Sequence, residues 1–473
     1  MTDTPHIAQT PAPPPLPASP RRPRLFARYG TVLKMAALGT LVLLLLIPLA
    51  MIRSVLNERL QRHHEAVAEI TSTWGDAQAV NGPILIVPYK YRVKVAKTLL
   101  VNGRMENVET TETQTAQACF LPEDLKIVGH LTPNVLHRGI YQAVVYSGKL
   151  ELSGTFAKPV FDDWKVAPED VAWEDATVVV MVADLRGAQE ALTLTWDGQA
   201  FPLVPGAKIE GFSSAVHARL KNVSSAQDRT PFSLNLSLNG STGLRLAPIG
   251  RQTQVRLTSP WPDPSFCGAF LPSERKVSPA GFEADWHVSY YGRPFPQQWS
   301  SQDRVNPVTP ASIESSMFGV DLIPVVDSYR YVERSIKYGV LFIVLIFTAF
   351  FLFEALASVR VHPFQYTLVG MALCLFYLAL LSLSEVIPFG AAYLAGAAVS
   401  TLMITLYSAR ALRSARRALA IGAELAAIYG FLFVILCLQD YSLLLGTAGL
   451  FLALAIVMFA TRNIDWYVRD EAN

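Results

Sequence analysis

The sequence predicts a polytopic α-helical membrane protein with a large β-rich, sandwich-like domain between its first and second membrane spans. Three observations support this fold class. One apolar run lies near the start and five more lie between residues 337 and 460, each close to the roughly 20 residues that cross a bilayer core. The long stretch between them is polar and shows strand-like segments instead. The composition, 51% hydrophobic and 16% charged, fits a chain divided between membrane and water.

The first elements are a tail, an anchor and a stalk. Residues 1–31 are rich in Pro and Ala, which predicts a disordered cytoplasmic tail. Residues 32–52 form the first span. This run is longer than a signal-peptide core and no small-residue cleavage site follows it, so we interpret it as an uncleaved anchor. In residues 53–81 apolar positions recur at helical spacing, and we expect the membrane helix to continue outward as a stalk.

Residues 82–336 are expected to form the β-rich domain. Short β-branched and aromatic runs alternate there with Gly, Pro, Asn and Asp, which is typical of a largely antiparallel sandwich. The segments that begin at Phe120 and Phe270 share the pattern Phe-Leu-Pro-x-x-x-Lys followed by a β-branched residue; a duplicated half-domain and a chance match both fit. Cys119 and Cys267 lie beside these segments, where either a disulfide or two unpaired thiols fits the sequence.

The last part is a predicted five-helix bundle, residues 337–460, followed by a cytoplasmic tail, 461–473. Its spans are expected at 337–357, 366–384, 386–407, 418–438 and 441–460. Basic residues set the orientation. With six spans, they fall on one side of the membrane: Arg21, Arg22, Arg24, Arg28, Lys34, Arg360, His362, Arg410, Arg413, Arg416, Arg417, Arg462 and Arg469. Both termini are therefore predicted inside and the β domain outside.

Three carboxylates in or near the spans are candidate bundle positions. Glu354 lies in the second span, Glu385 at the junction of the third and fourth, and Glu424 in the fifth. A charge in the bilayer is costly, so such groups face the bundle interior or water. One interpretation is a path for protons or substrate. The other is local pairing, of Glu354 with Arg360 or His362 and of Glu424 with Arg416 or Arg417, while Glu385 lies near the surface.

No sequence motif predicts a metal, a cofactor or a catalytic site. His63 and His64 are adjacent on the stalk helix and point about 100° apart, which favours a solvated face over a metal site. Ser273 and Lys276 have Ser-x-x-Lys spacing, but they lie in a strand-and-turn context without the partner motifs of acyl enzymes. The net charge of +2 gives no support for nucleic acid as a partner.

Several long strings resemble the CreD family of bacterial inner-membrane, cell-envelope integrity proteins, in the same order from about residue 56 to 467. They include Glu58-Arg-Leu, Glu69-Ile70, Trp74-Gly75, Gln78, Gly82-Pro83, Val87-Pro88-Tyr89, Arg138-Gly-Ile-Tyr141, Trp261-Pro-Asp-Pro-Ser-Phe266, Gly268-Ala-Phe-Leu-Pro272 with Phe270, Gly281-Phe282, Trp286, Phe318-Gly-Val-Asp321, His362-Pro-Phe-Gln-Tyr366, Leu380-Leu-Ser-Leu-Ser-Glu385 and Thr461-Arg-Asn-Ile-Asp-Trp-Tyr467. The resemblance implies an inner-membrane location, a periplasmic β domain and a role in envelope integrity under stress. It implies no defined reaction.

Three hypotheses about function follow. The first is a non-enzymatic envelope-maintenance protein whose periplasmic domain engages an envelope protein or polymer; Arg138, Tyr141, Trp261, Phe270 and Trp286 are the candidate motif positions. Its other expected partner is the lipid bilayer. The alternative is a transporter for a small solute or lipid, using the five-span bundle. The third is an acyl enzyme built on Ser273. Aromatic residues of the outer domain could line a glycan groove, but such residues more often form a sandwich core.

Overall fold

The computed structural model describes residues 30–101, 104–206, 214–221, 223, 228–303, 307–322, 328–357, 361–411, 414–438 and 441–462. The chain divides into two compact units. The helical unit comprises the chain up to Glu58 and from Ser328 onward, and the β unit comprises Arg59–Asp327. Most of the two predicted tails lies outside the described residues, as do Arg360, Arg413 and Arg469.

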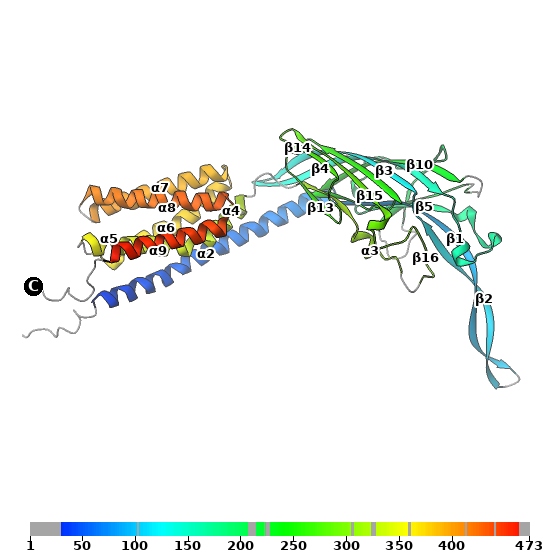
Figure 1. The fold of residues 1–473 in the computed structure, drawn as a ribbon, viewed down its shortest axis with the longest axis horizontal. Helices are drawn as coiled ribbons and strands as arrows, with labels where there is room; N and C mark the ends of the chain where they lie inside the picture. The colour runs from blue at the N-terminus through cyan, green and yellow to red at the C-terminus, as the bar shows by residue number, and fades with distance from the viewer. Residues whose placement is uncertain are drawn as a thin grey trace, which may run out of the picture. The chain divides into compact units, whose positions relative to one another are not determined.

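The predicted apolar runs all fall on helices (Figure 1). The helices are α2 (Gly30–Trp74), α4 (Ser328–Lys337), α5 (Gly339–Ala357), α6 (Pro363–Ser384), α7 (Phe389–Ala411), α8 (Ala415–Cys437) and α9 (Ser442–Thr461). In the part of the chain that the structure describes, five helices are long and apolar enough to cross a membrane, and α4 with α5, bent by 47°, makes a sixth if the pair is one span.

The predicted anchor and stalk are one continuous helix, α2, which passes Pro48 without ending. It ends at Trp74 rather than at residue 81. Gly75 causes this end: its φ of +142° suits only glycine, and a Cβ there would lie 2.7 Å from the carbonyl oxygen of Asn239. The next strand begins at Gln78.

A separate amphipathic helix, α4, precedes the second predicted span, 337–357. Val332, Ser335 and Ile336 are buried, whereas Arg330 and Lys337 are exposed. Its charged residues explain why the sequence assigned this segment to the β domain, which was expected to extend to residue 336. The apolar helix α5 starts at Gly339, after the bend.

The β unit is built from two sheets. The first contains β13 (Pro264–Gly268), β17 (Phe318–Leu322), β11 (Gly243–Leu246), β1 (Gln78–Val101), β5 (Thr177–Val182), β9 (Ala215–Arg219) and β8 (Val204–Pro205) in that order, with β2 (Arg104–Phe120) on β1 and β16 (Gln298–Ser300) on β2. The second has the order β14 (Glu274–Ser278), β15 (Gly281–Ser289), β12 (Gln252–Ser259), β3 (Asp124–Arg138), β4 (Tyr141–Ala157), β10 (Arg229–Ser241), β6 (Thr193–Trp196) and β7 (Gln199–Pro202).

The sheets share one hydrophobic core, which confirms the predicted sandwich-like β domain. Buried and exposed residues alternate along β3, β10, β12 and β15, as period-two side-chain packing requires. Buried residues of both sheets, such as Val179 and Leu234, belong to a single cluster. Most described strand pairs are antiparallel, but β1 with β11 and β3 with β12 are parallel. A short helix, α3 (Pro310–Glu314), precedes β17.

The hairpin β1–β2 extends beyond the sandwich. Its strands pair continuously from Leu85 with Phe120 to Val101 with Arg104. In contrast, β5 pairs with β1 only as far as Ile86, and β16 pairs with β2 only from Ala118 onward. Residues 90–101 and 104–115 therefore form a two-stranded ribbon, the β1–β2 arm, which projects from the sandwich in Figure 1.

Candidate functional site

The C-terminal end of α2 is held in the β unit by a polar network, the stalk junction. The Arg186 guanidinium donates to the carbonyl oxygen of Ser72 at 3.1 Å and pairs with Asp76 and Asp184. The Trp74 indole N–H donates to the carbonyl oxygen of Tyr146 at 3.2 Å. A cation over the last turn of a helix satisfies carbonyls that have no partner within the helix.

Asp184 is the centre of the stalk junction. It is 8% exposed and accepts from the backbone N–H groups of Asp76 and Arg186. The hydrogen bond from the Arg186 side chain lowers the pKa of Asp184 to about 2, against the opposing effect of burial. Gln78 adds side-chain N–H bonds to the carbonyl oxygens of Asp184 and Asn239, at 3.0 and 2.8 Å. These bonds fix the start of β1 directly after the helix.

Arg138 and Tyr141, two of the motif positions, lie against the stalk. They flank the turn between β3 and β4. Arg138 forms an ion pair with Glu69 of α2, and the Tyr141 ring lies edge-on to His63 with centroids 5.7 Å apart. His63 therefore packs against a tyrosine, and His64 is exposed. No metal-binding group of three or more His, Cys, Asp or Glu side chains occurs among the described residues.

Trp261, Phe270 and Trp286 belong to or pack against the hydrophobic core of the sandwich. Trp286 is 1% exposed, lies 5.6 Å from Phe318 between ring centroids, and donates its indole N–H to the carbonyl oxygen of Phe270 at 3.2 Å. Phe270 and Trp261 are half-buried against the same core. The fully buried Trp286 is thus a packing residue, whereas Trp261 keeps a partly exposed face.

The first and last strands of the β unit, β1 and β17, lie on either side of β11. Gln78 at the start of β1 and Val320 in the last strand, β17, are both register partners of Leu244 in β11. Beside them Arg245 holds Asp321 through two hydrogen bonds of 2.8 and 3.0 Å. The strand that follows α2 and the strand that leads toward α4 are therefore joined through one strand.

The two cysteines outside the helical unit are free thiols. Cys119 is paired with Ile86 of β1, whereas Cys267 lies in β13, on the far side of β17 and β11. With strands about 4.8 Å apart, this separation exceeds the Cα distance that a disulfide can span. Burial raises the pKa of Cys119 to about 12 and that of Cys267 to about 11, so both thiols are protonated near neutral pH.

The two Phe-Leu-Pro segments occupy equivalent places in the topology. Each follows a strand of the first sheet, β2 or β13, and leads into a hairpin of the second sheet, β3–β4 or β14–β15. The duplicated half-domain stays a prediction that this equivalence supports. Ser273 directly precedes β14 and Lys276 lies within it, so neither is on a helix, and the Ser273 hydroxyl accepts from the backbone N–H of His287.

Glu354 has partners other than those the sequence suggested. It forms an ion pair with Lys34 of α2 and accepts a hydrogen bond from the Tyr366 hydroxyl at 3.0 Å. The Lys34 ammonium also donates to the carbonyl oxygen of Val361 at 3.2 Å. Three helices, α2, α5 and α6, meet at this half-buried polar triad. Sequence reasoning used Lys34 only for orientation; an ammonium inside an apolar run was the signal that it needs an acidic partner.

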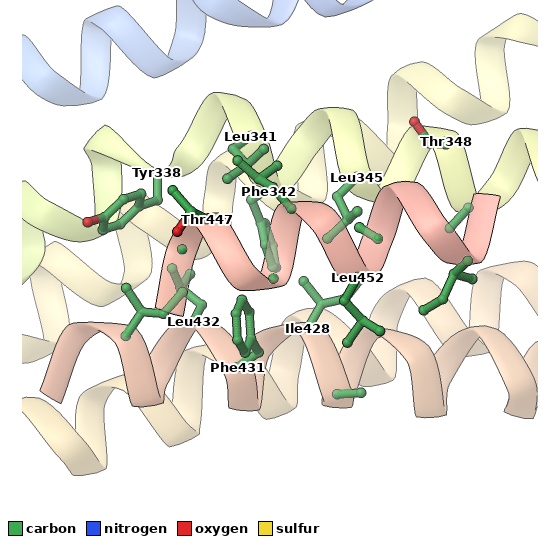
Figure 2. Close-up of a pocket in the computed structure, with 18 of the residues that line it drawn as sticks. Tyr338, Leu341, Phe342, Leu345, Thr348, Ile428, Phe431, Leu432, Thr447 and Leu452 are labelled. Atoms are coloured by element: carbon green, nitrogen blue, oxygen red, sulfur yellow. The ribbon is translucent and has the colours of Figure 1, made fainter. Parts of the chain in front are cut away.

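Glu385 and Glu424 lie in different surroundings. Glu385 ends α6 and accepts from the Tyr329 hydroxyl of α4 at 3.3 Å. Glu424 is half-buried in α8 and forms no ion pair with Arg416, Arg417 or any other described residue. It lines an apolar cavity of about 520 Å³ between α5, α8 and α9 (Figure 2). The three carboxylates therefore do not converge on one site.

Apolar helices long enough to cross a bilayer and a separate β sandwich define a multi-helix membrane protein with a large β domain. Residues 30–467 match the family model described as inner membrane protein CreD. The chain is 33% identical over 435 residues to inner membrane protein CreD of Escherichia coli (strain K12), an alignment covering 92% of this chain and 93% of that relative. The chain therefore belongs to the CreD family and is an inner membrane protein, which confirms the resemblance seen in its motifs.

Comparison with solved structures adds little. Yeast LTA4 hydrolase in complex with bestatin matches 35% of this chain and 26% of its own, at 11% identity and a TM-score of 0.18. The native yeast enzyme matches 46% of this chain and 35% of its own, at 9% identity and the same score. Similarity this low carries no argument about fold or function.

Proposed function

We propose that this protein maintains the cell envelope without catalysing a reaction, by engaging an envelope component through its β domain while its helices hold that domain at the inner membrane. The observation that carries this proposal is the continuity of β1. The strand begins four residues after α2 ends and runs without interruption into the β1–β2 arm. The arm and the membrane anchor are thus consecutive elements, with the stalk junction fixing the connection between them.

The surface of the arm indicates the kind of component. On one face, Lys90, Arg92 and Lys94 stand opposite Thr115, Thr113 and Thr111, and all six side chains are exposed. Only Lys94 in this row has a described acidic neighbour, Glu109 at 3.7 Å, and an exposed pair of this kind is weak. Three cations on β1, each opposite a hydroxyl on β2, complement a polymer or protein surface that carries phosphate or carboxylate groups.

The proposal includes the topology predicted from the basic residues, with six spans, both termini in the cytoplasm and the β domain in the periplasm. In this arrangement α4 and α5 count as one bent span. The arm then faces the periplasm, where an envelope polymer or partner protein is accessible.

In-cell photocrosslinking tests this function. A photoreactive residue at Thr111 or Thr113 is expected to capture an envelope component, and capture should fall when 1 M salt shortens the electrostatic range to about 3 Å. The matched control is Thr193, an equally exposed threonine on β6. Equal capture from the arm and from Thr193, or none from either, would contradict the proposal.

A lipid or solute transporter is the second candidate, because the carboxylate of Glu424 lines an apolar cavity within the bundle. Transport through the bundle requires its carboxylates. Substituting Glu354, Glu385 and Glu424 one at a time by Gln should then abolish complementation of an envelope-stress phenotype; normal complementation by all three variants argues against transport.

A further inference from the structure

The cavity between α5, α8 and α9 is apolar and elongated. Its wall is formed mainly by Leu, Ile, Val and Phe side chains, and Figure 2 shows Phe342 and Leu345 of α5 opposite Ile428 and Phe431 of α8. Lining residues extend from Leu341 to Leu352 along α5, which is about 16 Å at 1.5 Å per residue. Water gains few hydrogen bonds in such a space, whereas a hydrocarbon chain restores the dispersion contacts that a void forfeits.

The cavity is accessible from the bilayer because α9 closes it incompletely. No described residue of α9 is buried, although Leu450 and Ala453 line the cavity and Phe451 is 75% exposed. A helix held at so few points leaves hydrocarbon of the surrounding lipid within reach of the cavity. The occupant suggested by this geometry is an acyl chain lying parallel to the helices.

The two ends of the cavity differ in charge. At one end lie Tyr338, which lines the cavity, and Arg334, whose guanidinium donates to the carbonyl oxygen of the lining residue Ile435 at 3.4 Å. Lys337 is exposed beside them, in a weak i,i+4 pair with Glu333. At the other end lies the carboxylate Glu424. An anionic headgroup is attracted to the first end and repelled from the second.

We infer that this cavity binds a phospholipid of the surrounding bilayer, with an acyl chain between α5, α8 and α9 and an anionic headgroup beside Arg334 and Lys337. The inference is independent of the function proposed for the arm, because it rests only on residues of the helical unit. The bound lipid would fill the cavity and mediate packing of α9 against α5 and α8.

Gly446 provides a direct test. It lines the cavity, and a Cβ added to it meets no atom within 4 Å, so Gly446→Leu fills the space without a backbone clash. Gly430→Leu is the matched control: its Cβ is equally unobstructed, but Gly430 is exposed and does not line the cavity. Native mass spectrometry of the purified full chain should detect one retained phospholipid, enriched in anionic headgroups over the membrane extract. Retention should fall at least tenfold in Gly446→Leu and stay unchanged in Gly430→Leu.

Two further measurements keep the inference open to refutation. Lys337→Gln should lower the ratio of anionic to zwitterionic lipid retained; an unchanged ratio contradicts the headgroup assignment. In the wild-type chain, a phospholipid with a photoreactive acyl chain should label Leu450 or Ala453 after detergent dilution, but not the outward-facing Phe451. Equal lipid retention by the wild type and Gly446→Leu, with labelling confined to outward residues, would overturn the binding site.

Discussion

At the scale of single residues, the candidate positions have distinct physical roles. Arg138 and Tyr141 contact the stalk helix, while Trp286 and Phe270 pack in the core. The sequence identified them through a family resemblance, which marks positions without saying what they contact. Asp184 and Arg186, the centre of the stalk junction, lay outside every motif, because an Asp-x-Arg pair is common in turns and only the fold brings it to the end of α2.

Trp286 should be essential for stability. Trp286→Ala is expected to lower the free energy of unfolding of the β domain by about 3–5 kcal/mol, because it removes a fully buried indole and leaves a cavity. Thermal unfolding of the full chain, followed by near-ultraviolet circular dichroism, measures this. Tyr291→Ala removes an aromatic ring that is 83% exposed and is the control. Similar effects of the two substitutions would contradict the core assignment.

Asp184 should make the stalk junction sensitive to acid. Its pKa in the folded protein, about 2, is below the ordinary value of 3.8, so its ionised form stabilises the fold. This stabilisation is complete above pH 4 and is lost as the pH falls from about 4 to about 2. Because Arg186 is exposed, we expect on the order of 1 kcal/mol. Unfolding temperatures of wild type and Asp184→Asn should differ at pH 6 and converge near pH 2; a constant difference would exclude the linkage.

At the scale of elements, the periodicity of apolar residues predicted the type of most helices and strands, but not which strands pair. The apolar runs predicted the long helices that the structure describes in the bundle, and the short β-branched and aromatic runs predicted the sandwich. Helix ends were less predictable, because they depend on local chemistry. His362 and Gln365 form a capping box, with Pro363 in the first turn, so α6 begins three residues before the predicted span. The strand order was not predictable, since hydropathy contains no information on which strands are neighbours.

The pair Lys34–Glu354 shows why the sequence did not predict the contacts between helices of the bundle. The two residues are 320 positions apart in the chain, so no local spacing connects them. Lys34→Met and Glu354→Gln should each destabilise the bundle by about 1–3 kcal/mol, because each leaves a half-buried charged group without its ion-pair partner. The double variant should be more stable than the sum of the single effects predicts, by about 0.5–3 kcal/mol. Thermal unfolding of the wild type, the two single variants and the double variant in detergent measures these free energies. Strict additivity of the single effects would show that the two groups do not interact.

At the scale of the whole molecule, the chain combines a membrane bundle and a soluble-type sandwich. Composition and the distribution of apolar runs were sufficient to predict this division and to exclude an ordinary soluble fold. The boundary at α4 was misplaced, since the polarity of this amphipathic helix is compatible with either part of the chain. The partner of the β domain was not predictable, because it is encoded in surface groups such as the row on the arm rather than in core periodicity.

The topology has a direct test. A periplasmic reporter inserted after Gly198, in the exposed turn between β6 and β7, should be active, because no atom lies within 4 Å of a Cβ added there. The same reporter placed after Arg462, at the end of α9, should be inactive, and a cytoplasmic reporter should give the reverse pattern. Activity of the periplasmic reporter at both sites would refute six spans with both termini inside.

Gln78 and Val320 are both register partners of Leu244, and this has a consequence for how the sandwich is attached to the rest of the chain. The first and last strands of the sandwich lie only two strand spacings apart, about 10 Å. A linker of a few glycines would close this part of the chain into a ring at small entropic cost. The sandwich can therefore be regarded as an insertion in a helical protein, with its two attachment points beside each other. Removing it for separate study would leave all its strand pairings intact.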